Sequence, residues 1–322
     1  MKTCFIFNPH SGRQRRNARL LPLLREFIAG QRLEAEILTT EAPGHATILA
    51  RRAVAAGCAR VVAVGGDGTM NEVAQALVRT PAALVLVPCG SGNGLARHLG
   101  LPTSPPEALA LLARGDAGIA IVDTGTAAGL PFFNAMGLGL DAEVSRRFNQ
   151  LETRGLPSYA RTALAAFRAQ APEACTISDG SRQESREILL ITVANSEQYG
   201  NGARIAPGAR VDDGLLDLVA VGPVGMAGAA ILALRLFTGR IDGSAGVRRW
   251  RGSRFLITRS APGLIHTDGE PHPAAAAFEV AVLPRSLRVV VPAASARFLE
   301  LGAEALPASA ARQEVVTFAL KI

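Results

Sequence analysis

The stretch that decides the fold is RVVAVGGDGTMNEV, residues 60–73. A short β-branched run leads into a turn with three glycines, and residues of helical character follow. This order of strand, turn and helix is typical of a parallel α/β sheet. Glycines without Cβ let backbone N–H groups approach phosphate oxygens, and the helix N-terminus adds a positive dipole. An isolated Gly-Gly-Asp-Gly is equally typical of a plain tight turn, so the neighbouring sequence has to decide.

The same alternation runs through the first part of the chain. β-branched runs predict strands at residues 4–7, 34–39, 60–64 and 83–87. The segments between them predict helices at residues 16–30, 45–57 and 70–79. Open α/β folds bind ligands at the carboxyl ends of their strands, which is where the glycine turns fall. We therefore expect a binding site that is built from loops.

Two further loops share the small residues of the first. PCGSGNGLA, residues 88–96, follows one predicted strand, and NPHSGR, residues 8–13, follows another. The three loops should meet at one sheet edge, where N–H, hydroxyl and guanidinium donors suit an anion. The Walker pattern G-x-x-x-x-G-K-[ST] is absent, and the glycines of residues 90–94 lack the spacing of the dinucleotide fingerprint.

After Asp123 the pattern changes to that of a β-rich domain. Strand-like runs lie at residues 132–136, 187–194, 215–221, 255–259, 278–282 and 287–291, and helical patterns at 157–170 and 224–239. The helix at 224–239 is apolar around most of its circumference. We expect a buried core helix, with a lipid-facing element as the alternative. The basic run 248–251 favours either contact with anionic lipid through Trp250 or a solvated edge strand.

Composition limits the classes of function. The chain has 322 residues, which favours two domains, and no apolar run approaches the roughly 18 residues of a membrane span. Its first residues predict a strand and no signal peptide, and its four cysteines show no C-x-x-C pair. The net charge of +7 comes almost wholly from arginine. That charge suits a polyphosphate or an anionic membrane, whereas aromatic residues are too few for nucleic-acid stacking.

The three loop motifs, Asn-Pro-x-Ser-Gly, Gly-Gly-Asp-Gly-Thr-x-Asn-Glu-Val and Gly-Ser-Gly-Asn-Gly-Leu-Ala-Arg, resemble those of the diacylglycerol kinase catalytic family in order and spacing. That family includes sphingosine and ceramide kinases and bacterial relatives. The similarity continues through residues 39–46, 134–142, 212–217 and 267–271. It implies an α/β amino-terminal domain, with a parallel sheet like that of NAD kinase and phosphofructokinase, and a mainly β carboxyl-terminal sandwich domain.

The expected ranges are a nucleotide-binding α/β domain at residues 1–125, a lipid- and metal-binding β-sandwich at 126–300, and a return linker with a last strand at 301–322. The alanine-rich segment 293–311 is the linker, and residues 315–322 are the strand.

The resemblance implies a cytoplasmic, peripherally membrane-associated lipid kinase with ATP and Mg²⁺ as cofactors. The γ-phosphate of ATP would pass to the hydroxyl of diacylglycerol or of a related lipid such as a sphingoid base, ceramide or phosphatidylglycerol. A homodimer is left open. The alternatives are an NAD kinase-like phosphotransferase, which the carboxyl-terminal motifs argue against, and a nucleotide-binding regulatory protein that performs no chemistry.

The resemblance also assigns roles to residues. The expected nucleotide contacts are Asn8, Pro9, Ser11, Gly12, Arg13, Thr40, Gly65, Gly66, Asp67, Gly68, Thr69, Asn71, Glu72 and Ser91. Relatives often carry lysine where Arg13 stands, and a planar guanidinium does not bind like a point charge. The expected Mg²⁺ ligands are the side chain of Asp213 and the backbone carbonyls of Arg210 and Leu215, since a hard cation prefers oxygen.

The last motif, Asp268-Gly269-Glu270, holds the expected general base. Two carboxylates flank a glycine, so that one can accept a proton while the other orients it. The chain offers no lysine in these loops, so a carboxylate must serve as the base. We favour Glu270, with Asp268 assisting, although the family pattern does not separate the two.

Overall fold

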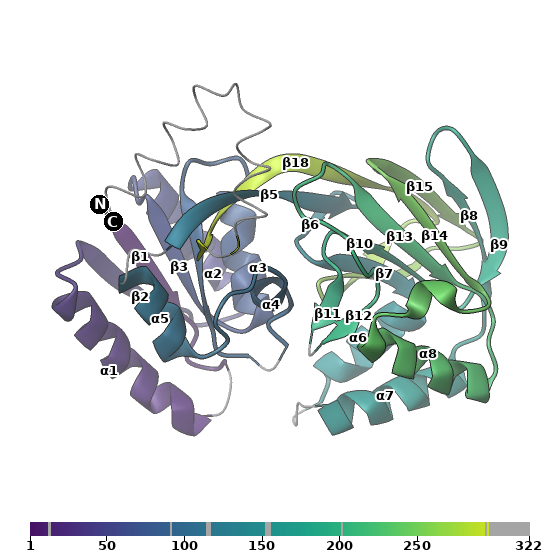
Figure 1. Ribbon diagram of the computed structural model, residues 1–322, viewed down its shortest axis with the longest axis horizontal. Coiled ribbons are helices and arrows are strands. Elements are labelled where there is room, and N and C mark those ends of the chain that lie inside the picture. Colours follow the sequence, from purple (N-terminus) through teal and green to yellow (C-terminus); the bar gives the residue numbers. More distant parts are fainter. Residues whose placement is uncertain are drawn as a thin grey trace. The chain divides into compact units, whose positions relative to one another are not determined.

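The computed structural model describes residues 1–11, 14–90, 92–113, 117–151, 156–200, 202–293 and 295. The chain divides into two compact units (Figure 1). Unit 1 contains Met1–Val122 together with the described residues from Arg285 to Ser295, and unit 2 is Asp123–Pro284. The expected second domain, residues 126–300, is therefore cut short at residue 284, because the long last strand returns to unit 1.

Unit 1 is built around a parallel sheet in the order β2-β1-β3-β4. These strands are β1 (Thr3–Phe7), β2 (Ala35–Thr39), β3 (Arg60–Gly65) and β4 (Ala83–Pro88). The carboxyl-terminal part of β18 (Ala277–Pro292) pairs parallel with β4. The helices are α1 (Gln14–Gly30), α2 (His45–Ala55), α3 (Asp67–Leu77), α4 (Gly94–His98) and α5 (Pro105–Ala113). The predicted α/β alternation is confirmed.

The three central strands are buried along their whole length, as expected of a parallel sheet with helices on both faces. On one face, Phe5, Val62 and Val85 pack with α1 and α5, while α2 and α3 lie against the other (Figure 1). Helix α3 begins at Asp67, three residues before the predicted start. The glycine turn itself is thus the first turn of this helix, which decides how it presents its N–H groups.

Unit 2 contains two antiparallel sheets. The first is six-stranded, in the order β14-β13-β10-β7-β16-β17. These strands are β7 (Ala135–Gly139), β10 (Leu190–Ala194), β13 (Leu216–Val221), β14 (Val247–Gly252), β16 (Gly263–Thr267) and β17 (Glu270–Ala274). The second contains the amino-terminal part of β18 with β15 (Arg254–Arg259), β8 (Glu173–Ser178), β9 (Gln183–Ile188), β6 (Leu130–Phe132) and the end of β5 (Ala117–Ala127).

A buried cluster joins the two sheets of unit 2. It contains Met136, Leu138 and Val193 from the first sheet and Phe255 and Ile257 from the second, and this packing confirms the predicted sandwich. The remaining elements are α6 (Leu140–Asn149), α7 (Leu156–Ala169), α8 (Met226–Thr238), a 3₁₀ turn (Ile241–Gly243) and the short hairpin β11 (Gln198–Gly200) and β12 (Ala203–Arg204).

Four strand predictions differ from the structure. The run 132–136 is divided between β6 and β7, because the N–H groups of the residues between them turn toward a carboxylate of another loop. The run 187–194 is likewise divided, between β9 and β10. Conversely, the two runs at 278–282 and 287–291 belong to the single strand β18.

The expectation of a buried helix at 224–239 was wrong. Helix α8 contains no buried residue, and only Leu232 and Leu236 pack partly against the six-stranded sheet. The basic run is an edge strand, β14, as one alternative held. Its Trp250 is buried in the sandwich core and cannot lie at a membrane interface.

The predicted linker and last strand lie outside the described residues, apart from Ala293 and Ser295. No helix within the described ranges is long and apolar enough to cross a membrane.

Candidate active site

The turn between β3 and α3 presents backbone donors. Gly66 is the N-cap of α3, and the N–H groups of Asp67, Gly68 and Thr69 form its first turn. None of these three groups has a hydrogen-bond acceptor among the described residues, whereas the N–H of Met70 bonds to the Gly66 carbonyl at 3.0 Å. Unpaired N–H groups and the helix dipole together make the start of α3 suited to an anion.

The glycines of this turn serve different purposes. A Cβ on Gly65 would lie 2.5 Å from Thr69 Cβ, so that position is closed by packing. A Cβ on Gly66 would lie 3.5 Å from Gly90 Cα, which is ordinary contact between two loops. A Cβ on Gly68 would meet nothing within 4 Å. Position 68 is therefore open in the protein itself, and any need for glycine there comes from a ligand.

The loop after β1 joins this turn through side chains. Asn8 Nδ2 donates to Thr69 Oγ1 at 2.9 Å, and Ser11 Oγ accepts from the N–H of Gly66 at 3.3 Å. The loop after β1 and the turn after β3 thus lie together, as predicted. Pro9 belongs to the same loop, while Gly12 and Arg13 lie outside the described residues.

Asp67 connects the turn between β3 and α3 to the loop that follows β4. Its Oδ2 accepts from the N–H of Asn93 at 2.8 Å and its Oδ1 from the N–H of Gly94 at 2.9 Å. Hydrogen bonds to a charged group are each worth about 1.5–3 kcal/mol net. The Asp67 carboxylate therefore holds a loop in place, and each of its oxygens already has one donor.

Glu72 plays a similar part for α2. Its Oε1 and Oε2 accept from the N–H groups of Gly44 and Ala46 at 2.8 and 3.0 Å. The positive dipole at the N-terminus of α2 also stabilises a carboxylate there. Thr40 is buried at the end of β2, and its N–H bonds to the Phe7 carbonyl at 2.9 Å.

The third loop contains one polar atom that sequence reasoning missed. Asn93 adopts the left-handed conformation (φ 52°), and its Nδ2 donates to the Gly90 carbonyl at 2.9 Å. Its Oδ1 is buried and has no hydrogen-bond partner among the residues that the structure describes. The asparagine shapes the loop around the predicted contact Ser91, which is itself outside the described residues. The side chain of Asn71 forms no hydrogen bond with any described residue.

The Asp-Gly-Glu motif lies in unit 2, at the two-residue turn between β16 and β17. Asp268 and Gly269 have φ angles of 50° and 86°, and positive φ at both positions is typical of the Asp-Gly turns of β-hairpins. Asp268 accepts three N–H groups, from Phe133 at 2.7 Å, Asn134 at 2.7 Å and Ala135 at 3.0 Å.

The two carboxylates of the motif have opposite environments. Burial raises the pKa of Asp268 to about 6, although its three N–H donors and His266 act in the opposite direction. The carboxyl group of Asp268 is committed to the backbone at 133–135. Glu270 is exposed, and its side chain forms no hydrogen bond or ion pair with the described residues. Of the two carboxylates, Glu270 is the more exposed.

A buried polar network supports this turn and was not predicted from sequence. His266 Nδ1 accepts from the N–H of Gly269 at 3.1 Å, and its Nε2 lies 3.2 Å from Asp141 Oδ2. The same oxygen accepts from Thr192 Oγ1 and from Tyr199 OH, each at 2.7 Å. Burial alone would raise the pKa of Asp141, but His266 and the hydrogen bonds from Thr192 and Tyr199 hold it below its usual value.

Asp213, the predicted metal ligand, lies in the loop before β13. Its Oδ1 accepts from the N–H of Leu215 at 3.0 Å, and its Oδ2 pairs with the guanidinium of Arg251. Burial raises the pKa of Asp213. The side chain of Arg210 pairs with Asp212 at 3.0 Å, which leaves its carbonyl as the expected metal contact.

The donor set around Asp213 fits a hard cation in chemistry, because carboxylate and carbonyl oxygens are the ligands that Mg²⁺ prefers. Arg251 supplies the opposite charge at the same carboxylate, so a cation would have to displace it. Across the described ranges, no group of three or more His, Cys, Asp or Glu side chains is placed to hold a metal ion. Any metal here would rely on backbone carbonyls and water.

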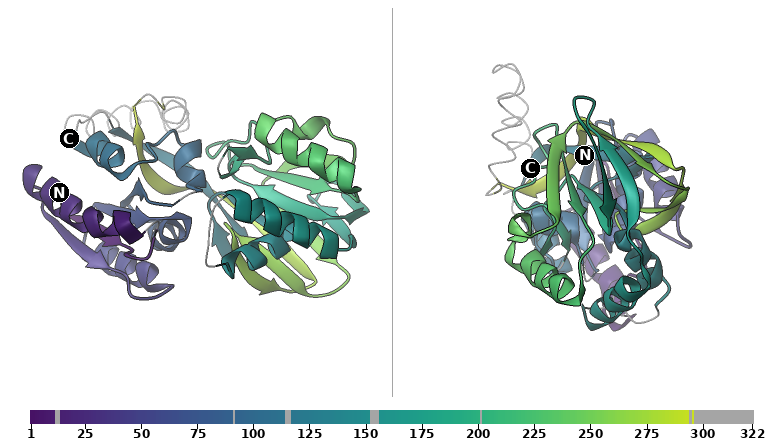
Figure 2. Two further views of the ribbon diagram at one scale, coloured as in Figure 1. Left: turned by 90° about the horizontal axis from the view of Figure 1, so that it is seen from below. Right: turned by 90° about the vertical axis from the view of Figure 1, so that its right-hand side faces the viewer.

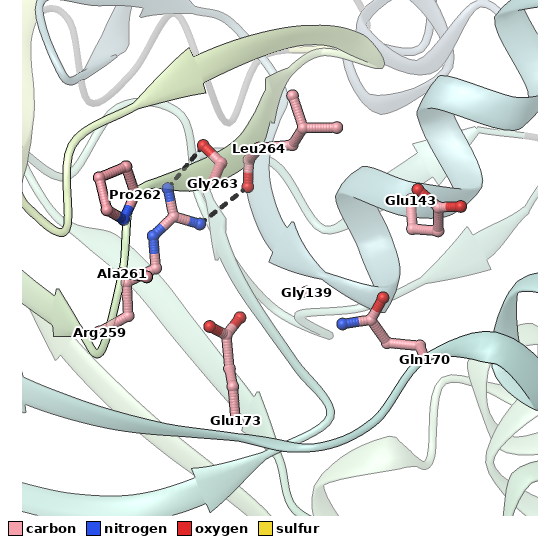
Figure 3. A pocket seen from close by; sticks show the side chains of 9 residues that line it. All are labelled: Gly139, Glu143, Gln170, Glu173, Arg259, Ala261, Pro262, Gly263 and Leu264. Atoms are coloured by element: carbon pink, nitrogen blue, oxygen red, sulfur yellow. Dashed lines mark hydrogen bonds between the residues drawn. The ribbon is translucent and has the colours of Figure 1, made fainter.

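A surface hollow of about 260 Å³ in unit 2 holds none of the predicted site residues. Figure 3 shows Arg259 at its wall, where Nη1 and Nη2 donate to the carbonyls of Leu264 and Gly263 at 3.0 and 2.7 Å. The guanidinium is thus occupied by the backbone, which leaves Glu143 and Glu173 as the other charged residues of the lining.

Comparison with known families identifies both parts of the chain. Residues 2–127 match the diacylglycerol kinase catalytic domain. Residues 134–291 match the YegS C-terminal NAD kinase beta sandwich-like domain.

Curated relatives extend over most of the length. A protein named "Probable lipid kinase YegS-like" from Pseudomonas aeruginosa is 34% identical over 280 residues, which are 84% of this chain and 90% of the relative. A protein of the same name from Pseudomonas putida is 32% identical over 265 residues, 81% of this chain and 86% of the relative.

Solved structures share the fold. A diacylglycerol kinase from Bacillus anthracis superposes with a TM-score of 0.68 at 20% identity, over 91% of this chain and 98% of that one. An NAD kinase from Archaeoglobus fulgidus in complex with ATP gives a TM-score of 0.54 at 13% identity, over 95% and 100%. The matched domains and the relatives agree with the loop motifs and the Asp-Gly-Glu turn. The chain therefore belongs to the diacylglycerol kinase catalytic-domain family and, within it, to the YegS-like lipid kinases.

Proposed function

We propose that the protein transfers the γ-phosphate of ATP to the hydroxyl of a glycerolipid or sphingolipid at a membrane surface. The observation that carries the nucleotide half of the proposal is the start of α3, where three N–H groups lack an acceptor in the described structure and position 68 is open. A kinase family implies ATP as the phosphoryl donor. Phosphoryl transfer depends mainly on positioning and charge stabilisation, which the N–H groups at the start of α3, called the cradle below, would supply.

The nucleotide contacts divide into two groups. The N–H groups of Gly68 and Thr69 and the hydroxyl of Ser11 would face the phosphates. Asp67 and Glu72 would act through the loops that their carboxylates hold, at residues 93–94 and 44–46. The second group positions the cradle and does not touch the nucleotide with its carboxylate oxygens.

We assign proton removal to Glu270. Its carboxylate would take the proton of the lipid hydroxyl as the new bond from that oxygen to the γ-phosphorus forms and the bond to the β-phosphate oxygen breaks, which releases ADP. Asp268 supports this role indirectly, because its hydrogen bonds to residues 133–135 fix the turn that carries Glu270.

Mg²⁺ is proposed at Asp213 with the carbonyls of Arg210 and Leu215. A bound cation would neutralise carboxylate charge in this loop, a role that Arg251 fills in the present structure. A metal ion bound at Asp213 would displace the guanidinium of Arg251. Because Arg251 lies in β14, metal binding at the loop would then be coupled to that strand.

The experiment that tests the function is phosphorylation of a lipid panel in mixed micelles, with labelled ATP and Mg²⁺. Diacylglycerol, a sphingoid base, ceramide and phosphatidylglycerol cover the acceptor classes. The proposal expects one of them to be labelled, and labelling to need a free hydroxyl on that lipid. Labelling of NAD, with none of any lipid, would refute it.

A further inference from the structure

Helix α8 carries an apolar face that no part of the described chain covers. Leu234 is 67% exposed, Ile231 53%, Phe237 50% and Met226 49%, and the helix has no buried residue. Single exposed apolar residues are ordinary on protein surfaces, but a contiguous group of them marks an interaction site. This face therefore calls for an occupant.

The exposed residues form one stripe. Ile231, Leu234 and Phe237 recur at spacings of three, which places them on one side of the helix. Leu232 and Leu236, four apart, face the other way and pack against the small cluster on the outer face of the six-stranded sheet. In the left view of Figure 2, α8 (light green) lies along the border of unit 2, beside its strands. The helix is thus anchored by one face while its opposite face points outward.

The charges around α8 fit an anionic surface. Residues 222–241 contain no acidic residue, and their two charges are Arg235 and Arg240. Within the described structure neither arginine forms an ion pair with a carboxylate, and Arg235 donates to Ser244 Oγ at 2.9 Å. The next acid, Asp242, is paired with Arg249 at 2.8 Å. An apolar stripe with basic residues at one end is typical of helices that lie in the headgroup region of a bilayer.

We propose that α8 is the membrane-docking element of this protein, and that it inserts Ile231, Leu234 and Phe237 into an anionic bilayer. The inference rests on the proposed function, because a lipid kinase must reach a substrate that resides in a membrane. It goes further in naming the surface. A second copy of the chain could cover the same stripe, but its arginines would add a second positive end without supplying acidic groups to meet the first.

The test compares the double variant L234E/F237E with the parent chain and with Leu256→Glu. Leu256 is 49% exposed on β15, a strand in which exposed and buried residues alternate. Its replacement by glutamate therefore places a carboxylate on an exposed apolar position outside α8. Vesicles of phosphatidylcholine, alone or mixed with phosphatidylglycerol, are sedimented with each protein. L234E/F237E should lose at least about tenfold in affinity for the mixed vesicles, while Leu256→Glu should bind like the parent.

A fluorescence variant keeps the inference testable apart from the charge change. The single tryptophan, Trp250, is buried, so a tryptophan placed by Leu234→Trp would report mainly on the new position. Its emission should shift to shorter wavelength on addition of mixed vesicles. No shift, or equal vesicle binding by L234E/F237E and parent, would overturn the inference. If the parent forms a dimer without lipid and L234E/F237E is a monomer, the inference is overturned in favour of a second copy of the chain.

The two proposals fail in different ways. If α8 is the docking element of a lipid kinase, L234E/F237E should phosphorylate a short-chain, water-dispersed lipid as fast as the parent and a vesicle lipid more slowly. Vesicle binding that depends on α8, with no lipid ever labelled, would sink the kinase function and leave the docking surface standing.

Discussion

Replacement of Gly68 by alanine separates the protein's own needs from those of the nucleotide. A Cβ at this position meets no atom within 4 Å, and the residue lies in the first turn of α3. Alanine is favoured over glycine within helices by roughly 0.5–1 kcal/mol. The folded protein should therefore keep its stability or gain slightly in its free energy of unfolding.

ATP binding should respond in the opposite direction. A methyl group beside the unpaired N–H groups of the turn would push a phosphate oxygen out of hydrogen-bond distance. The loss of one hydrogen bond to a charged group costs about 1.5–3 kcal/mol. At about 1.4 kcal/mol for each tenfold change, the dissociation constant for ATP should rise roughly 10- to 150-fold.

The assay is calorimetric titration with ATP, run beside thermal unfolding. Gly30→Ala is the matched control, because Gly30 ends α1, also has nothing within 4 Å of an added Cβ, and lies in a helix outside the three loops. The control should bind ATP like the parent. Unchanged ATP affinity in Gly68→Ala would refute the assignment of the phosphates to this turn. A loss of stability in Gly68→Ala would instead show that position 68 is not open.

The other predictions concern unit 2. Glu270→Gln keeps the size of the side chain but removes its basicity, so turnover should fall by about 10²–10⁴-fold while ATP affinity stays the same; normal turnover would mean that Glu270 is not the base. Because the pKa of Asp268 is raised to about 6, its favourable contribution is complete below about pH 4 and is lost as the pH rises through 6. Urea unfolding at pH 4 and pH 7 should show up to about 3 kcal/mol of this loss in the parent and little in Asp268→Asn, and equal pH dependence of the two would contradict it. Asp213→Asn should lower activity in a way that added Mg²⁺ partly restores, and Arg251→Gln should lower the Mg²⁺ concentration needed for half-maximal activity, since it frees Asp213 Oδ2; identical Mg²⁺ titrations in all three proteins would exclude a cation at this loop.

The sequence by itself determined the α/β alternation, the sandwich and the family. These rest on local information: β-branched runs before glycine turns, helical patterns after them, and motifs in fixed order. The helix observed at residues 67–77 was predicted at 70–79 from its helical residues alone. Its first turn, which contains Gly68, was predicted as part of the preceding loop. Short stretches sufficed because periodicity and turn chemistry act between residues close in the chain.

The tertiary structure alone decided which polar atoms are occupied. Asp67 and Glu72 look like ligand contacts in their motif, yet their oxygens hold backbone N–H groups about 26 residues away in the sequence. Asp268 bonds to residues more than 130 positions earlier, and so leaves Glu270 as the free carboxylate. No local pattern encodes such pairings, because each partner comes from another loop.

Helix α8 shows the same division most clearly. Its composition is apolar on nearly every side, which predicts burial, and the sequence gives no count of how many of those sides a neighbour covers. In the folded unit only the side with Leu232 and Leu236 finds a sheet to pack against, while Leu234 remains 67% exposed. Hydrophobicity is a property of the residues, whereas burial depends on which other elements the chain brings to them.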